Sequence, residues 1–180
     1  VALDAAAIQS LLADDNKKLR SLVLDAAAES QELVDALCDR SPDFRSALTA
    51  PAMIASLMVP DTASIALNLL EKLDIAVGDA LSELIIAKDA KGKSKLLALM
   101  EKWDACAPLL DKLCAANTTI GSAVMSAEMF AALAKPSTAA VALMLIEKGL
   151  PIDDALLAPL LNASGGVSWL DGTLHNPPPD

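Results

Sequence analysis

The sequence predicts an all-α fold, a helical-repeat solenoid made of two tandem copies of a unit of about 76 residues. Three observations lead to this prediction. Hydrophobic residues make up 54% of the chain but aromatic residues only 2%, so the apolar mass consists mainly of alanine and leucine, which favour helices. The β-branched and aromatic residues that favour strands are scarce. Finally, the sequence matches itself when it is shifted by 76 positions.

The internal match is strongest between residues 46–72 and 122–148, where nearly half of the positions agree. Chance agreement for this composition is roughly a tenth, so a duplication is the economical explanation. Examples of matched pairs are Met53 and Met129, Pro60 and Pro136, Thr62 and Thr138, Leu67 and Leu143, Leu69 and Leu145, and Lys72 and Lys148. We therefore expect residues 31–73 and 107–149 to superpose, with Leu67 and Leu143 buried in the two copies.

Apolar residues at the 3.6-residue period, together with capping and breaking residues, predict the individual helices. We expect them near residues 4–14, 17–28, 30–39, 43–58, 61–73, 77–88, 93–103, 106–115, 123–134, 137–149 and 153–162. Asp61 and Ser137 each follow a proline and precede an apolar run, which suits an N-cap, while Gly149 and Pro151 mark a helix end. The sequence thus predicts a helical repeat domain over 1–163, with copy one at about 1–90 and copy two at about 91–163. An irregular tail rich in Gly and Pro follows over 164–180.

Residues 145–161, LIEKGLPIDDALLAPLL, resemble the junction between two ankyrin repeats. Leu145, Ile146 and Gly149 match the end of that family's second helix. Ile152 and Asp153 match its finger loop, and Pro159 and Leu160 match the turn that opens the next first helix. Ala158 and Leu161 stand where the family carries Thr and His. The resemblance implies a divergent ankyrin-like solenoid or another α-α repeat, and it implies no enzyme activity.

The formal net charge of −10 disfavours binding to nucleic acids and to anionic membranes, because such a surface repels phosphate groups. The one basic run, Lys88 to Lys95, is interrupted by Asp89 and Gly92 and is interpreted as a solvated loop. No uncharged apolar run reaches the 18 or so residues of a membrane-spanning helix, so membrane insertion is not expected.

The residues that most often carry chemistry do not form a recognisable catalytic or metal-binding pattern. The single histidine, His175, lies in the predicted tail, away from any fixed nucleophile. Cys38, Cys106 and Cys114 lack the close pairing of a zinc site and are interpreted as small buried hydrophobes. Their odd number favours a reducing compartment, the cytoplasm, or the host cytoplasm for an effector. We expect no enzyme activity and no cofactor.

The function that the sequence favours is a non-enzymatic scaffold that binds another protein through a helical-repeat surface. The acidic charge favours a partner with a basic patch, and a secreted bacterial effector is one biological setting for such a scaffold. The candidate binding residues lie at expected finger loops: Asp74, Asp79, Trp103, Asp104, Asp153 and Asp154. Trp103 suits either an interface anchor or a filler between repeats. The alternative function is a carrier of an apolar small molecule, a lipid or pigment, held between the two copies.

Overall fold

The computed structural model describes residues 38–151, together with residues 18, 21, 23 and 36. This part of the chain is helical, and the only β pairing within it is an isolated bridge between Lys88 and Ser94. The all-α prediction is therefore confirmed for the described residues. The elements are α4 (Pro42–Thr49), α5 (Pro51–Leu57), η1 (Pro60–Thr62), α6 (Ala63–Lys72), α7 (Asp79–Ile86), α8 (Lys95–Met100), α9 (Trp103–Ala116), α10 (Thr118–Val124), α11 (Ala127–Leu133), η2 (Pro136–Thr138) and α12 (Ala139–Glu147).

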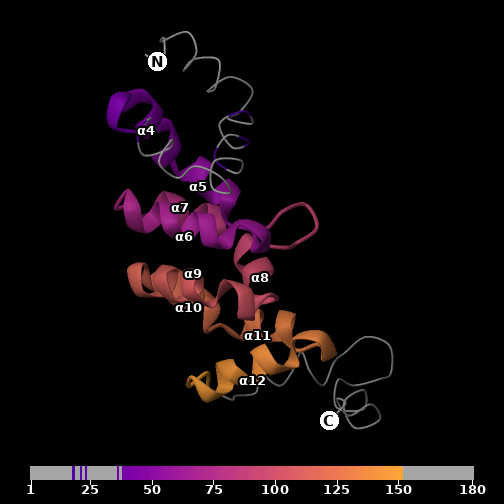
Figure 1. The fold of residues 1–180 in the computed structure, drawn as a ribbon. Coiled ribbons are helices and arrows are strands. Elements are labelled where there is room, and N and C mark those ends of the chain that lie inside the picture. The colour runs from indigo at the N-terminus through magenta and orange to yellow at the C-terminus, as the bar shows by residue number, and fades with distance from the viewer. Residues whose placement is uncertain (1–17, 19–20, 22, 24–35, 37, 152–180) are drawn as a thin grey trace.

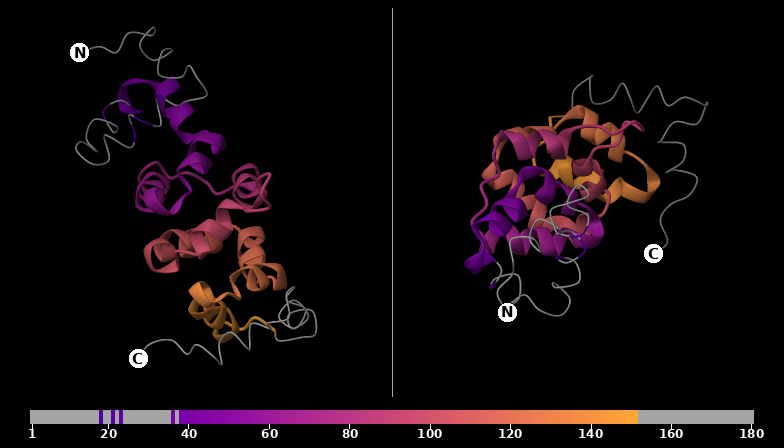
Figure 2. Two further views of the ribbon diagram at one scale, coloured as in Figure 1. Left: turned by 90° about the vertical axis from the view of Figure 1, so that its right-hand side faces the viewer. Right: turned by 90° about the horizontal axis from the view of Figure 1, so that it is seen from above.

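The α-helices fall into three consecutive groups of three, α4–α6, α7–α9 and α10–α12, and each helix packs on the next one within its group. Neighbouring groups also contact each other, because α5 packs on α7, α6 on α9, α7 and α9 on α10, and α8 on α11. Figure 1 and the left view of Figure 2 show the groups following one another along one direction from indigo to yellow. One cluster of buried side chains runs through all three groups, from Val23 to Leu150.

The helix predicted over 43–58 is wrong as a single element, because the chain forms two helices there. Ala50 adopts an extended ψ of 134° and separates α4 from α5. The reason is Pro51, which lacks an N–H group and disfavours a helical conformation for the residue before it. Ser41 starts α4 as its N-cap, with its hydroxyl accepting a hydrogen bond from the Phe44 N–H at 3.2 Å.

The helix predicted over 123–134 is also two helices. Ser126, between α10 and α11, has an extended conformation, and its hydroxyl accepts a hydrogen bond from the Met129 N–H at 3.1 Å. A serine that bonds to the third N–H after it begins a helix rather than continuing one. The predictions over 93–103 and 106–115 misplace their common boundary, because α9 already begins at Trp103. The predictions at 4–14, 17–28, 30–39 and 153–162 lie mainly or wholly outside the described residues.

The corner between α5 and α6 has the same local geometry as the corner between α11 and α12. Each corner contains one proline. The residue before it is Val59 at the first corner, with φ and ψ of −135° and 155°, and Lys135 at the second, with −130° and 155°. Thr62 and Thr138 follow with nearly equal angles, −122° and 11° against −131° and 11°. The helices on either side are bent by 103° at the first corner and by 112° at the second.

A side-chain hydrogen bond closes each corner. The Thr62 hydroxyl donates to the carbonyl oxygen of Leu57 at 2.7 Å, and the Thr138 hydroxyl donates to that of Leu133 at 2.6 Å. Each bond gives a second donor to a carbonyl group at the end of the preceding helix. That carbonyl also accepts the N–H of the residue two positions later, Val59 or Lys135.

Helices α6 and α12 also end in the same way. Each is followed by one residue in the left-handed region, Asp74 with φ 49° and Gly149 with φ 98°. The next N–H then bonds back to the carbonyl oxygen five residues earlier, from Ile75 in one case and from Leu150 in the other, at 3.0 Å in both. This pattern is the Schellman motif, which usually places glycine at the left-handed position.

The expectation that Leu67 and Leu143 are buried alike is wrong. Leu143 is 57% exposed and Leu67 is only partly buried. The positions buried in both helices are instead Ala66 with Ala142 and Leu69 with Leu145. They lie one residue before and two residues after the matched leucine. Leu143 therefore points away from the core, whereas Leu67 still packs against it with part of its surface exposed.

Among the described residues, no single helix is both long and apolar enough to cross a membrane. Two bent pairs reach the required length and composition only when their helices are joined, and they are the pairs on either side of the two corners.

Candidate binding surfaces

Asp74 and Asp79 lie at the two ends of the short connection between α6 and α7. Asp74 is the left-handed residue after α6, and Asp79 is the first residue of α7. Both side chains are exposed, and neither forms an ion pair within the described part of the chain. A hollow of about 320 Å³ lies beside the end of α6, lined by Cys38, Asp39, Arg45, Lys72 and Leu73. We call the segment Asp74–Asp79 the acidic loop.

The acidic loop is held in place by a residue from the next group of helices. The Nδ2 atom of Asn117 donates a hydrogen bond to the Val77 carbonyl oxygen at 3.0 Å. The Oδ1 atom of the same side chain accepts from the N–H groups of Thr119 and Ile120, at 2.9 and 3.3 Å. Asn117 therefore caps α10 and fixes the acidic loop with one amide group.

Trp103 and Asp104 lie in the first turn of α9 rather than in a loop. Trp103 is partly buried against the core, and the Nζ atom of Lys148 lies over its ring, 4.9 Å from the centroid. Lys148 Nζ also lies 3.9 Å from an oxygen of Asp111. Asp104 is exposed and forms no ion pair among the described residues. The ring thus contacts the core, as a filler does, and also meets a lysine from another helix.

The structure does not bring all the predicted binding residues together. Trp103 and Asp104 begin α9, whereas Asn117, which touches the acidic loop, follows its last residue. A helix of 14 residues is about 20 Å long, so the two pairs of candidates lie at opposite ends of α9. Asp153 and Asp154 lie outside the described residues.

The basic run that the sequence suggested to be a solvated loop is a folded hairpin between α7 and α8, which we call the basic hairpin (residues 88–95). An oxygen of Asp89 accepts hydrogen bonds from the N–H groups of Lys91 and Lys93, at 2.8 and 2.9 Å. The Asp89 N–H donates to the Lys93 carbonyl oxygen at 3.0 Å, and Gly92 takes a φ of 76° at the turn. The hairpin stands out from the stacked helices at the right of Figure 1. The signal for it in the sequence was an aspartate three residues before a glycine.

Ion pairs join the basic hairpin to α8 and α11. Lys88 pairs with Glu128, and Lys93 pairs with Glu101, which Lys135 also approaches at 3.6 Å. The hydrogen bond from Lys93 lowers the pKa of the Glu101 carboxyl. Partial burial raises this pKa, but by less. The charge of Lys93 and the interaction with Lys135 lower the pKa further.

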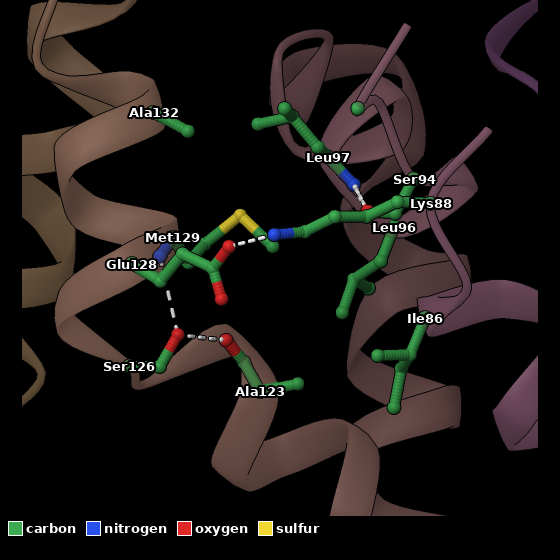
Figure 3. Close-up of a pocket in the computed structure, with 11 residues that line it drawn as sticks. Ile86, Lys88, Ser94, Leu96, Leu97, Ala123, Ser126, Glu128, Met129 and Ala132 are labelled. Atoms are coloured by element: carbon green, nitrogen blue, oxygen red, sulfur yellow. Dashed lines mark hydrogen bonds and ion pairs between the residues drawn. The ribbon is translucent and has the colours of Figure 1, made fainter. Parts of the chain in front are cut away.

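A pocket of about 100 Å³ opens between the basic hairpin and α11 (Figure 3). Its wall is mainly apolar, with Ile86, Leu96, Leu97, Met129 and Ala132 among its lining residues. Figure 3 shows the Lys88 side chain reaching across the pocket to Glu128. A second hollow, of about 290 Å³, lies on another side of the same hairpin, where Val59 and Ala98 contribute to it.

The surroundings of Cys106 and Cys114 do not favour a reactive thiolate at either residue. Burial raises the pKa of the Cys106 thiol, and the charge of Asp61 raises it further. Burial and Asp111 also raise the pKa of Cys114, against a smaller opposite effect of Lys148. A raised pKa keeps a thiol protonated, and the thiolate is the reactive form. Within the described part of the chain, no group of three or more His, Cys, Asp or Glu side chains is placed to hold a metal ion.

Comparison of the chain with protein-family models, with curated proteins and with solved structures gives no significant match.

Proposed function

We propose that this chain is a non-enzymatic helical-repeat scaffold that binds another protein, and that its repeat arose by duplication of a unit of about 76 residues. Support for the duplication comes from the two corners, which share backbone angles, a threonine hydrogen bond and a bend. The matching ends of α6 and α12 add to it. The left-handed Gly149 suits the ankyrin-like helix end seen in the sequence, whereas three helices per group favour another kind of α-α repeat.

The binding proposal rests mainly on Asp74, because an aspartate at this position destabilises the end of α6. An aspartate in the left-handed region costs roughly 1 kcal/mol more than glycine does. Its charge also lies at the negative end of the α6 dipole, where an acid is unfavourable. The equivalent position after α12 carries glycine. An exposed residue that destabilises its own helix end, and that gains no ion pair in return within the described chain, is best explained by contact with a partner.

This proposal requires a partner that has a basic surface where it contacts the acidic loop. Asp74 and Asp79 flank one short connection that Asn117 holds in place, so two carboxylates are presented on a fixed backbone. Arginine and lysine side chains are the groups that such a pair attracts, and exposed charges of this kind mainly speed the encounter between partners.

The test begins with affinity purification and mass spectrometry to identify a partner, which is then produced pure. Asp74→Gly and Asp79→Asn are expected to slow association by about two- to five-fold each and to weaken its salt dependence. Glu147→Gln is the matched control, because it removes one exposed carboxylate from α12. Asp74→Gly is also expected to stabilise the free protein by roughly 0.5–1 kcal/mol, so lost binding cannot be attributed to unfolding.

Normal binding by both acidic-loop variants would show that this surface is the wrong one. Trp103→Ala and Asp104→Asn then test the other end of α9, which we propose as a separate second contact. A loss of binding confined to these two variants would move the interface there.

The alternative function, a carrier of an apolar molecule, gains no support from the pocket between the basic hairpin and α11. That pocket measures about 100 Å³, whereas small-molecule sites usually measure about 300–1,000 Å³. The hollow of about 320 Å³ beside α6 reaches this range, but Asp39, Arg45 and Lys72 line it, and charged side chains do not suit an apolar molecule.

A further inference from the structure

The basic hairpin is a positively charged element on an acidic protein. It carries Lys88, Lys91, Lys93 and Lys95 within eight positions, whereas the whole chain has a net charge of −10. The hydrogen bonds of Asp89 hold the turn in one conformation. The lysines are therefore presented on an ordered element, which lowers the entropic cost of binding through them.

Only some of these lysines form ion pairs that stabilise the described fold. Lys93 is joined to Glu101, whose side chain is partly buried. Lys88 pairs with Glu128, but both side chains are mostly exposed, and an exposed ion pair contributes little to stability. Lys91 and Lys95 form no ion pair among the described residues. An incoming carboxylate can therefore meet Lys91 or Lys95 directly, or replace Glu128 at Lys88.

The pocket beside the hairpin adds an apolar contact next to these charges. Leu96 and Met129 form part of its wall and are almost fully buried, and the small side chain of Ala132 lines it on the α11 side. Its volume of about 100 Å³ is suited to one aliphatic side chain rather than to a lipid chain. Lys88 lines this pocket, and Lys95 lines the second hollow, which shares Lys88 and Ser94 with it. An extended peptide that crosses the hairpin can therefore engage both.

We propose that the basic hairpin and its pocket bind an acidic peptide segment of a partner protein, with one aliphatic side chain of that segment in the pocket. This site is separate from the acidic loop and takes the opposite charge, so it goes beyond the scaffold function proposed above. A peptide suits the site better than a membrane or a nucleic acid does, because both of these extend well past the hairpin and meet the repulsion of the remaining acidic surface.

The test uses a blocked peptide of four glutamates around one leucine, added to the ¹⁵N-labelled 180-residue chain. The expected result is a set of amide shift changes at Lys91–Lys95 and at Glu128–Ala132. Replacing the leucine by serine is expected to weaken binding about ten-fold, because the pocket is then left unfilled. A peptide in which lysines replace the glutamates is expected not to bind.

Variants separate the two parts of the site. Lys91→Gln and Lys95→Gln are expected to weaken binding by about two- to five-fold each, while Lys112→Gln, an exposed lysine of α9 that lines neither pocket, leaves it unchanged. Ala132→Leu fills the pocket and is expected to remove the preference for leucine over serine.

Any one of four results would overturn the proposal. The leucine and serine peptides would bind equally well, the shifts would fall away from the hairpin, or vesicles containing phosphatidylserine would bind the chain through Lys91 and Lys95 while the peptide does not. Self-association that Lys91→Gln abolishes, measured by sedimentation, would instead assign the site to a second copy of this chain.

Discussion

The Nζ atom of Lys148 lies 4.9 Å from the centroid of the Trp103 ring. This contact connects the residue that ends α12 with the first residue of α9, although 45 positions separate them in the sequence. The ring is also packed against the core, so Trp103 holds two groups of helices together whether or not it meets a partner.

Trp103→Ala is expected to destabilise the protein by about 1–3 kcal/mol, less than a fully buried tryptophan would, because the side chain is only partly buried. Lys148→Gln removes the cation above the ring together with the exposed ion pair to Asp111, and it is expected to cost about 0.5 kcal/mol. Urea unfolding measures both values, with Trp103→Phe as the conservative control. Equal losses for Trp103→Ala and Lys148→Gln would contradict the packing role of the ring.

Removing the corner threonines tests the hydrogen bonds shared by the two corners. Thr62→Val and Thr138→Val keep the shape of the side chain but leave the carbonyl groups of Leu57 and Leu133 without that donor. Each change is expected to cost about 1–2 kcal/mol in urea unfolding, with the buried Thr138 at the upper end. Thr119→Val, at an exposed position in α10, is the matched control. A corner variant as stable as the control would show that the bond is not important for the bend.

Leu143 and Leu145, two residues apart and therefore on nearly opposite faces of α12, are expected to respond very differently to truncation. Leu145 is fully buried, so Leu145→Ala should cost about 2–5 kcal/mol. Leu143 is 57% exposed, so Leu143→Ala should change stability by less than about 0.5 kcal/mol. Thermal unfolding followed by circular dichroism distinguishes the two cases. Similar losses at both positions would mean that α12 is rotated relative to the structure described above.

The lowered pKa of Glu101 predicts how stability depends on pH. The folded state has the lower pKa, so the carboxylate adds stability above the ordinary value of 4.5, and this contribution is lost as the pH falls through the folded-state pKa. Glu101→Gln is expected to cost about 0.5–1 kcal/mol at pH 7 and progressively less in acid. The same change in a Lys93→Gln background should cost less, because the main cause of the shift is then absent. A cost that does not vary with pH would contradict the proposed ion pair.

Local signals in the sequence account well for the starts and ends of several elements. Prolines at 51, 60 and 136 each begin a helix or a 3₁₀ turn in the structure, since proline needs no hydrogen-bond acceptor in a first turn. Gly149 ends α12 as predicted, because glycine takes the left-handed conformation without strain. Asp61 was expected to be an N-cap, but it lies within η1, and no side-chain cap is present there. Thr62 uses its hydroxyl to bond backward to Leu57 instead.

The sequence by itself determined that the described chain is helical and where several of its helices begin or end, because these features depend on propensities and capping within a few residues. Only the tertiary structure decided which side chains each helix buries and which candidate residues lie together. Leu67 and Leu143 repeat in the sequence, yet neither is fully buried, because burial depends on the helices packed around them. Likewise, the separation of Trp103 from the acidic loop follows from the length and direction of α9. The Lys88–Glu128 pair follows from the packing of α8 against α11.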